Sequence, residues 1–270
     1  MVVQHNMAAS NANRQLGIST NVLSKSTEKL SSGYRINRAA DDAAGLSISE
    51  KMRSQIRGLN KASSNAQDGI SAIQTAEGAL NEAHSILQRM NELATQAAND
   101  TNTTTDRKAV QSEIDALTKE ISRIASTTQF NTQNLLDGKF TGKNLQVGAL
   151  NGQSISISIK TMNAGALSVN ALDVTSFKAA GSAMNKIQVA IDKVSTQRSN
   201  LGALQNRLEH TVNNLDNVAE NTQTAESRIR DTDMASEMVQ YSATSIIQQA
   251  GQSMLAQANS QTQGVLSLIQ

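Results

Sequence analysis

The sequence predicts a mainly α-helical protein: a long antiparallel coiled-coil bundle with paired N- and C-terminal helices and a small β-hairpin. Three observations support this fold class. Proline, which interrupts helices, is absent from all 270 residues. Only 2% of the residues are aromatic, so a thick globular core is not expected. Apolar residues recur every seven positions in several segments, as in coiled coils.

The first helix is predicted near the N-terminus, where Val2, Ala9, Leu16, Leu23 and Leu30 are spaced by seven residues. Before Leu23, Arg14 supplies the only formal side-chain charge. Chain ends are usually solvated and rich in charge. A neutral end with helical apolar spacing is therefore expected to be buried against a partner.

The strongest repeat lies in residues 59–97 and predicts a coiled-coil rod about 60 Å long. A single amphipathic helix of a globular protein is the alternative, but its pattern drifts away from a strict seven-residue step over this length. One set of seam positions is Leu59, Ala66, Ile73, Leu80, Leu87 and Ala94, and the other is Ala62, Gly69, Ala76, Ala83, Met90 and Ala97.

The middle of the chain contains a polar loop, a further helix and a change of period. Residues 99–106 are polar and end in side chains that can cap a following helix. Alternation over about 144–160, with Asn151-Gly152 inside it, predicts a tight β-hairpin. Residues 161–180 are rich in Ala, Gly, Ser and Asn and are predicted to be an exposed loop. The seam of the further helix is predicted at Val110, Ile114, Leu117, Ile121 and Ile124.

The last part of the chain predicts another rod and a neutral terminal helix. From Ile187 to Ile229 the seven-residue step returns, and residues 234–270 carry one formally charged side chain, Glu237. Ile247, Met254, Val265 and Leu268 are predicted to form the seam of the terminal helix, with Ala250 and Ala258 filling it. We expect Leu16, Leu23 and Leu30 to pack against Ile247, Met254 and Leu268, or against the same residues in adjacent copies.

Composition and charge argue against several function classes. The net charge of +1 gives no electrostatic footprint for nucleic acid. The sequence contains no run of about 18 apolar residues, so membrane insertion is not predicted. The N-terminus lacks the pattern of a secretory signal peptide. With no cysteine, disulfides and thiolate chemistry are excluded.

Metal binding and catalysis are not expected either. His5, His84 and His210 fall in separate predicted helices without ligand-spaced neighbours. Asp41-Asp42 is interpreted as the start or cap of a helix and not as a metal site. No nucleophile elbow or phosphate-binding glycine motif occurs. The sequence predicts no enzyme activity and no cofactor.

Several segments resemble the signatures of bacterial flagellin, and the resemblance extends over essentially the whole chain. In the N-terminal half they are Leu30–Leu46 (LSSGYRINRAADDAAGL), Thr128–Asn131 and Asn134–Gly138. In the C-terminal half they are Leu201–Leu208, Gln248–Gly251, Leu255–Asn259 and Val265–Ile269.

The resemblance implies a short, two-domain form without the variable outer domains. Residues 1–44 and 230–270 would be the terminal helices of an inner-core domain, and residues 45–229 an outer-core helical domain with the hairpin. It implies a secreted subunit of the extracellular flagellum that polymerises into a filament and leaves the cell unfolded through the flagellar type III channel. Implied partners are other copies, an export chaperone at the C-terminal helix, and the filament cap and hook-associated proteins.

Two other functions are weighed against this one. A hook–filament junction protein of the same superfamily shares the terminal chemistry, although such proteins usually carry larger middle regions. A signalling coiled-coil module would need a charged, membrane-proximal end and an uninterrupted hairpin tip, and the neutral ends and the β-hairpin disfavour it.

The resemblance also implies two sets of site residues. A segment at 88–96 corresponds to the part of flagellins that engages host Toll-like receptor 5; the alternative is a solvated face without a partner. Asn91 stands where strongly stimulating members have a second arginine. The receptor set is Gln88, Arg89, Glu92, Leu93, Gln96 and Glu113. The polymerisation set is Leu16, Leu23, Leu30, Ile247, Met254, Val265, Leu266, Leu268 and Ile269, of which the last four also resemble a tail read by cytosolic inflammasome sensors.

Overall fold

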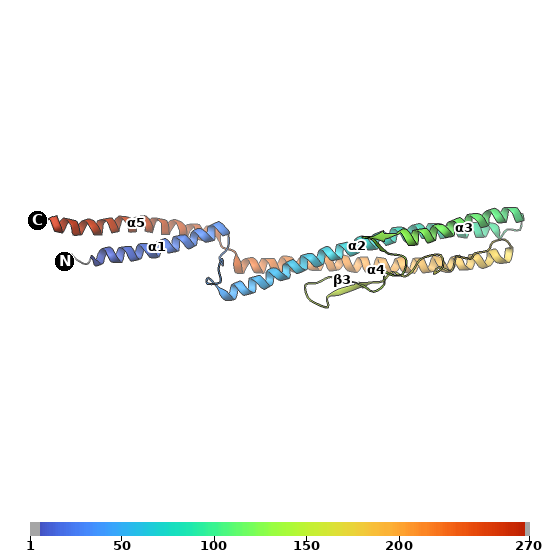
Figure 1. The fold of residues 1–270 in the computed structure, drawn as a ribbon, viewed down its shortest axis with the longest axis horizontal. Helices are drawn as coiled ribbons and strands as arrows, with labels where there is room; N and C mark the ends of the chain where they lie inside the picture. Colours follow the sequence, from blue (N-terminus) through green and yellow to red (C-terminus); the bar gives the residue numbers. More distant parts are fainter. Residues whose placement is uncertain (1–5, 268–270) are drawn as a thin grey trace. The chain divides into compact units, whose positions relative to one another are not determined.

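A computed structural model describes residues 6–267, with side chains through residue 261, and confirms a mainly helical fold (Figure 1). Contacts divide the chain into two units. Unit 1 comprises the described residues through Ser54 and those from Asn221 onwards, and unit 2 comprises Gln55–Glu220. The elements are α1 (Met7–Ser32), α2 (Ala43–Ala97), α3 (Thr104–Thr127), β1 (Gln129–Phe130), β2 (Gln133–Asn134), β3 (Lys143–Gln146), β4 (Ser154–Ile157), α4 (Phe177–Arg230) and α5 (Met234–Ser267).

In unit 1, α1 and α5 form an antiparallel pair (Figure 1). The side chain of Asn6, the N-cap of α1, donates from Nδ2 to the Ala258 carbonyl oxygen at 2.9 Å. At the other end of α1, the Lys29 ammonium lies 3.5 Å from a carboxylate oxygen of Glu237. Gly33 then ends α1 in the left-handed conformation, with φ of 77°. The predicted pairing of the terminal helices is confirmed.

The seam between α1 and α5 is made mostly of small and polar residues. Ser19 and Ser26 are the buried residues of α1, while Leu16, Leu23 and Leu30 are half-buried beside them. On α5 the less exposed positions again alternate by three and four residues. They are Glu237, Tyr241, Thr244, Gln248, Gly251, Leu255 and Ala258.

The prediction that Ile247 and Met254 pack against α1 of the same chain is wrong, and the alternative contact with adjacent copies stays a prediction. Their exposed fractions are 54% and 65%, and both point away from α1 in the single chain. The side of α5 toward α1 instead carries Gly251, Leu255 and Ala258, and Gly251 lies so close to Leu16 that an added Cβ would be in van der Waals contact, 3.5 Å from Leu16 Cδ1. Leu268 lies outside the described residues, and its predicted contact is not addressed.

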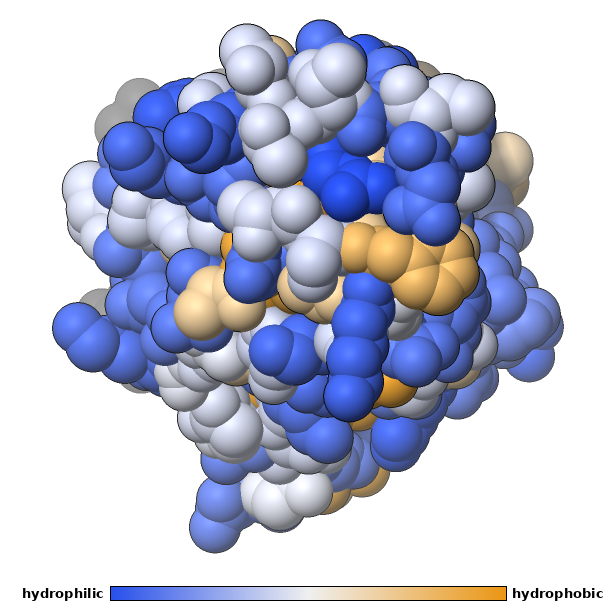
Figure 2. Space-filling model, turned by 90° about the vertical axis from the view of Figure 1, so that its right-hand side faces the viewer, coloured by the Kyte–Doolittle hydropathy of each residue, from blue (hydrophilic) through white to orange (hydrophobic). Residues whose placement is uncertain are grey.

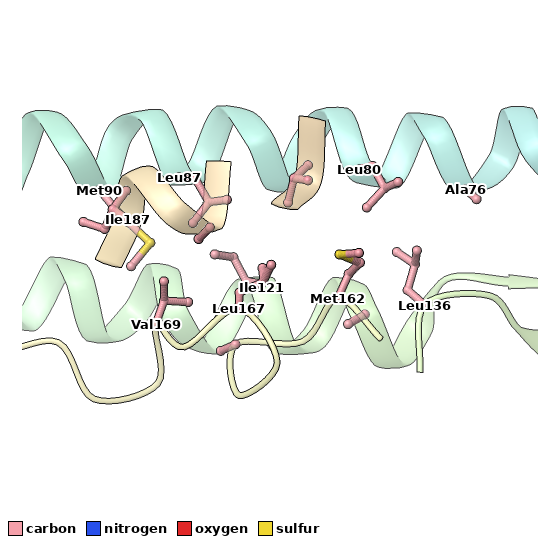
Figure 3. Packing of buried hydrophobic residues seen from close by; sticks show 14 of the residues in the cluster. Ala76, Leu80, Leu87, Met90, Ile121, Leu136, Met162, Leu167, Val169 and Ile187 are labelled. Atoms are coloured by element: carbon pink, nitrogen blue, oxygen red, sulfur yellow. The ribbon is translucent and has the colours of Figure 1, made fainter. Parts of the chain in front are cut away.

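In unit 2 the predicted seam of residues 59–97 is confirmed, because all twelve of its positions are buried. Leu80, Leu87 and Met90 of α2 point toward residues of α3 and of the segment that precedes α4 (Figure 3). On α4, Ile187, Val194, Leu201 and Leu208 complete the same core.

The hydroxyl of Ser63 on α2 donates to Asp216 Oδ1 on α4 at 2.9 Å, beside a smaller apolar cluster. That cluster consists of Leu59, Ala62, Leu215 and Ala219.

Seen from the end of unit 2 where α2 is followed by α3, the surface is mainly hydrophilic, with a few hydrophobic patches (Figure 2).

The start of α3 follows the capping prediction. Thr103 accepts a hydrogen bond from the Asp106 backbone N–H, and the Asp106 carboxylate accepts one from the Thr103 N–H. This reciprocal capping box satisfies two backbone donors that a helix start otherwise leaves free. Hydrogen bonds from Thr103 lower the pKa of Asp106. Ile114 and Ile121 of the predicted seam are buried, and Val110, Leu117 and Ile124 are half-buried.

The prediction that residues 161–180 form an exposed loop is wrong. Although the segment before α4 is irregular, Leu167, Val169 and Val174 are fully or almost fully buried (Figure 3). Side chains of the surrounding helices satisfy several of its backbone groups: Gln111 donates from Nε2 to the Leu172 carbonyl at 2.8 Å and accepts at Oε1 from the Val174 N–H at 2.9 Å, and Lys193 donates to the Ala166 carbonyl at 3.0 Å. Buried backbone groups need such partners, so Gln111 lets an irregular strap close the core.

The predicted hairpin is present, but its turn differs from the prediction. β3 and β4 pair antiparallel, with Leu145 opposite Ile155. The strands end at Gln146 and resume at Ser154, and of Asn151-Gly152 only Gly152 has positive φ, 86°. A tight turn of type I′ needs positive φ at both central residues. That turn lies instead between β1 and β2, at Asn131 (46°) and Thr132 (64°).

Candidate interaction surfaces

The large apolar side chains of α5 lie on its outside. Six of them have exposed fractions between 47% and 71%. They are Met234, Met238, Val239, Ile246, Ile247 and Met254. Successive residues of a helix are rotated by about 100°. On that basis Val239 and Ile246 lie opposite the seam with α1, while the pairs 247/254 and 234/238 lie on the two flanks.

This arrangement is unusual for the outside of a helix. A helix that is apolar all round is normally buried on every side, whereas in the single chain α1 covers only one side of α5. On α1, Met7 and Ile18 add further exposed apolar side chains. The surface of unit 1 therefore has the composition of an interface.

The predicted polymerisation residues fall into three groups. Leu16, Leu23 and Leu30 belong to the seam within unit 1. Ile247 and Met254 belong to the exposed face of α5. Val265 and Leu266 lie in α5 beyond the described side chains, and Leu268 and Ile269 lie outside the described residues. Sequence reasoning missed Met234, Met238, Val239 and Ile246, although the near absence of charge from residue 234 onwards was a signal for them.

The signature segment around Tyr34 contacts the end of α4 through polar groups within unit 1. The Arg35 N–H donates to the Arg230 carbonyl at 2.7 Å, and Arg230 NH1 donates to Glu50 Oε1 at 2.7 Å. The Arg230 guanidinium also lies 4.8 Å from the centre of the Tyr34 ring, within the range of a cation–π contact. The hydrogen bond from Arg230 lowers the pKa of Glu50.

The adjacent acidic pair has a capping role, as predicted. Asp42 Oδ1 accepts from the Gly45 N–H at 2.8 Å at the start of α2. Asp41 Oδ2 accepts from the Arg38 N–H at 2.9 Å, and this bond lowers the pKa of Asp41. Within residues 6–267, no three His, Asp or Glu side chains are grouped so that they could hold a metal ion. Nor is any helix in that range apolar enough over a sufficient length to span a bilayer.

A second candidate surface lies in unit 2, where an arginine connects α2 to α3. Arg89 Nε and NH2 lie 3.1 and 3.0 Å from Glu113 Oε1, and NH1 lies 3.1 Å from Glu92 Oε2. These two bonds to Glu113 are the main reason that the pKa of Arg89 is raised. All three side chains are substantially exposed, so the cluster is an accessible pattern of charge.

The other predicted receptor residues do not all share this surface. Gln88 and Gln96 are exposed beside Arg89, and Asn91 is half-buried. Leu93, however, is only 2% exposed and belongs to the core of unit 2. Its place at the seam gives it a packing role, so it is not part of the accessible surface.

These features define a class of protein: a helical structural protein whose terminal helices pair and whose apolar outer faces suit further protein partners. Family models described as the bacterial flagellin N-terminal and C-terminal helical regions match residues 3–141 and 184–269. The chain belongs to the bacterial flagellin family. Flagellins are structural, non-enzymatic proteins of the extracellular flagellar filament, which bacteria use for motility.

Full-length relatives agree with this assignment. The chain is 56% identical to a flagellin of Halalkalibacterium halodurans over 271 residues, covering 100% of both chains. It is 51% identical to a flagellin of Bacillus subtilis over 304 residues, again covering 100% of both. Among solved structures, the crystal structure of Bacillus cereus flagellin is 31% identical with a TM-score of 0.52, covering 56% of this chain and 88% of that one. These matches favour a flagellin over the junction-protein alternative.

Proposed function

We propose that α5 is the main assembly element of this filament subunit and that copies pack against it on several sides. The observation that carries this proposal is the distribution of its side chains: small and polar toward α1, large and apolar elsewhere. Removing one such apolar side chain from water contributes about 1.5–3 kcal/mol. Several neighbours around each α5 would therefore give a strongly favourable contact in the filament.

The same distribution leaves the helix pair weak in the free subunit. Ordering a residue costs about 1–2 kcal/mol of backbone entropy, and a seam built around Ser19, Ser26 and Thr244 buries little apolar surface to offset it. We propose that α1 and α5 become fully ordered only when a subunit joins the filament. This would restrain premature polymerisation before export.

Export and capping partners follow from the same surface. A type III export channel requires an unfolded chain, and a weak unit 1 without disulfides would unfold readily. An export chaperone that covers the apolar faces of α5 would keep copies apart until then. The filament cap and hook-associated proteins would bind the helix pair of subunits at the filament ends.

A matched pair of charge insertions tests the assembly surface. Val239→Asp places a carboxylate on the outer face of α5, and Val189→Asp makes the same change on exposed α4 in unit 2; the exposed fractions of the two valines are 71% and 52%. We expect Val239→Asp to reduce sedimentable filament at least tenfold and Val189→Asp to have a much smaller effect. Normal filaments from Val239→Asp would refute the role of α5.

We further propose that the Arg89–Glu113 surface is read by host Toll-like receptor 5. It is supported by the exposed, ordered charges of Arg89, Glu92 and Glu113, flanked by Gln88 and Gln96. Charged and amide groups that protrude from a rigid helical unit provide specific contacts at a protein interface. Asn91 contributes no charge here, so we expect moderate potency.

A charge-matched control exists on α3, where Arg123 and Glu120 form another exposed ion pair. We expect Arg89→Ala with Glu113→Ala to reduce receptor signalling in a cell reporter assay at least tenfold, and Arg123→Ala with Glu120→Ala to reduce it little. The melting temperature of each double variant checks that unit 2 remains folded. Equal signalling by the two variants would remove the assignment.

A further inference from the structure

The methionines of this chain differ sharply in exposure between the two units. Four of the nine have exposed fractions of 47–67% and lie in unit 1. In unit 2, Met90 and Met162 are at most 5% exposed and Met184 is half-buried; Met52, on the part of α2 that belongs to unit 1, is also half-buried. The four exposed methionines are Met7, Met234, Met238 and Met254.

Exposed methionines on an apolar interface have a chemical consequence that leucine or isoleucine would not have. A thioether packs as a flexible apolar group, but its sulfur can be oxidised to a polar, chiral sulfoxide. Met7 is on α1, Met254 is on one flank of α5, and Met234 and Met238 are on the other flank. Oxidation would thus place a strong hydrogen-bond acceptor on several of the faces through which copies contact each other.

We propose that these four methionines are a reversible oxidation site that controls whether a subunit can enter the filament. The oxidant is a peroxide. The thioether sulfur attacks one peroxide oxygen, the O–O bond breaks, and an S–O bond forms. Hydrogen peroxide is reduced to water while the sulfur loses two electrons. A thiol-dependent methionine sulfoxide reductase reverses the step. The inference rests on the proposed role of α5 in assembly.

Burial makes the site selective in two ways. Within one chain, oxidant reaches the four exposed sulfurs far more readily than Met90 and Met162, which lie in the core of unit 2 (Figure 3). Unit 2 therefore keeps its fold when unit 1 is oxidised. Between states, the contacts that cover α5 in a filament also shield its sulfurs, so free subunits are sensitive and assembled ones are protected.

The test combines mapping, assembly and repair on the full-length chain. Subunits are treated with hydrogen peroxide, the excess is removed, and oxidised residues are located by peptide mass spectrometry. We expect the four exposed methionines to oxidise at least tenfold faster than Met90 and Met162. Seeded assembly, followed by sedimentation and electron microscopy, is expected to fall at least tenfold, and reductase treatment should restore it. Preformed filaments should oxidise more slowly at the same sites.

A variant with Met→Leu at all four positions identifies the residues responsible, with Met52→Leu and Met184→Leu together as the control. Each variant is compared with its own untreated sample, so its starting level of assembly does not matter. The fourfold variant should lose most of its peroxide sensitivity, and the control should keep it. Full assembly of oxidised wild-type subunits, or oxidation confined to other residues, would overturn the inference. If the fourfold variant does not assemble, reductase repair of mapped wild-type subunits decides. Failure of untreated wild-type chain to assemble would instead refute the proposed function.

Discussion

Unit 1 and unit 2 use the same seven-residue spacing in opposite ways. In unit 2 the seam holds the large side chains, so Leu80, Leu87 and Ile187 are fully buried within one chain. In the α1–α5 seam of unit 1 the buried residues are Ser19, Ser26 and Thr244, Leu16, Leu23 and Leu30 are only half-buried, and six large apolar side chains of α5 are exposed. The difference teaches that periodicity identifies a helix pair but does not say which face is the internal one. Within one chain, unit 2 therefore has a buried apolar core, whereas unit 1 leaves large apolar side chains exposed on α5.

The largest effect is expected from a deletion that disrupts unit 1 and leaves unit 2 folded. Deleting residues 250–270 removes the part of α5 that lies against Leu16 and Asn6. We expect no filaments by electron microscopy, while the helical signal and melting transition of unit 2 persist in circular dichroism. Filaments formed by this truncated chain would contradict the comparison.

The next prediction compares one leucine from each unit. Leu80→Ala creates a cavity in a fully buried site and is expected to destabilise unit 2 by about 3 kcal/mol in urea denaturation. Leu16→Ala removes a half-buried side chain and should cost the free subunit about 1 kcal/mol or less. Similar losses for both variants would mean that unit 1 already has a developed core in the free subunit.

Removing one helix cap from each unit is expected to give a smaller difference in stability between the units. Thr103→Ala removes the capping box of α3 and is expected to cost unit 2 about 1 kcal/mol. Asn6→Ala removes the cap of α1 and its bond to Ala258. Because α1 is weakly held in the free subunit, we expect that change to reduce local amide-exchange protection without shifting the main unfolding transition. A shift as large as that of Thr103→Ala would argue against this.

The smallest expected effect is the contribution of Glu50 to the pH dependence of unit 1. Arg230 holds the pKa of Glu50 below its ordinary value of 4.5. Glu50 therefore stabilises the folded state above that ordinary value, and its contribution is lost as the pH falls through the lower folded-state pKa. Both tyrosines, Tyr34 and Tyr241, lie in unit 1, so tyrosine fluorescence follows this unit selectively. Glu50→Gln should flatten the loss of stability below about pH 4.5, whereas Glu82→Gln on α2 should not.

Much of the fold could be predicted because it depends on local periodicity. The α2 seam and the Thr103 cap follow from spacing and residue type. The burial of Leu167, Val169 and Val174 could not be predicted in this way, because distant side chains hold the irregular segment in place, among them Gln111, which makes two of its hydrogen bonds. The turn at Asn131-Thr132 was missed because neither residue is glycine, although both have positive φ.

For the candidate surfaces, residue type was a better guide than residue position. The neutral character of the chain ends predicts an interface, and this stays a prediction, whereas the expected packing of Ile247 and Met254 against α1 of the same chain is wrong because both are exposed. A helix apolar on several sides offers more than one candidate seam. In the structure, the side that carries Gly251 and Ala258 is the one that lies against α1. Leu93 was included in the receptor set, but it is a buried seam residue in a segment that also carries exposed side chains.

The Asn6–Ala258 hydrogen bond joins residues 252 positions apart, so its two partners are synthesised at very different times. A chain leaves the ribosome with its N-terminus first, so α1 emerges long before α5, the helix that packs against it. Closing so long a loop is entropically costly. Within unit 2, Leu59 of α2 and Leu215 of α4 belong to one apolar cluster, so distant parts of the chain also meet there. The pairing of α1 with α5 can therefore be completed only when almost the whole chain has been synthesised.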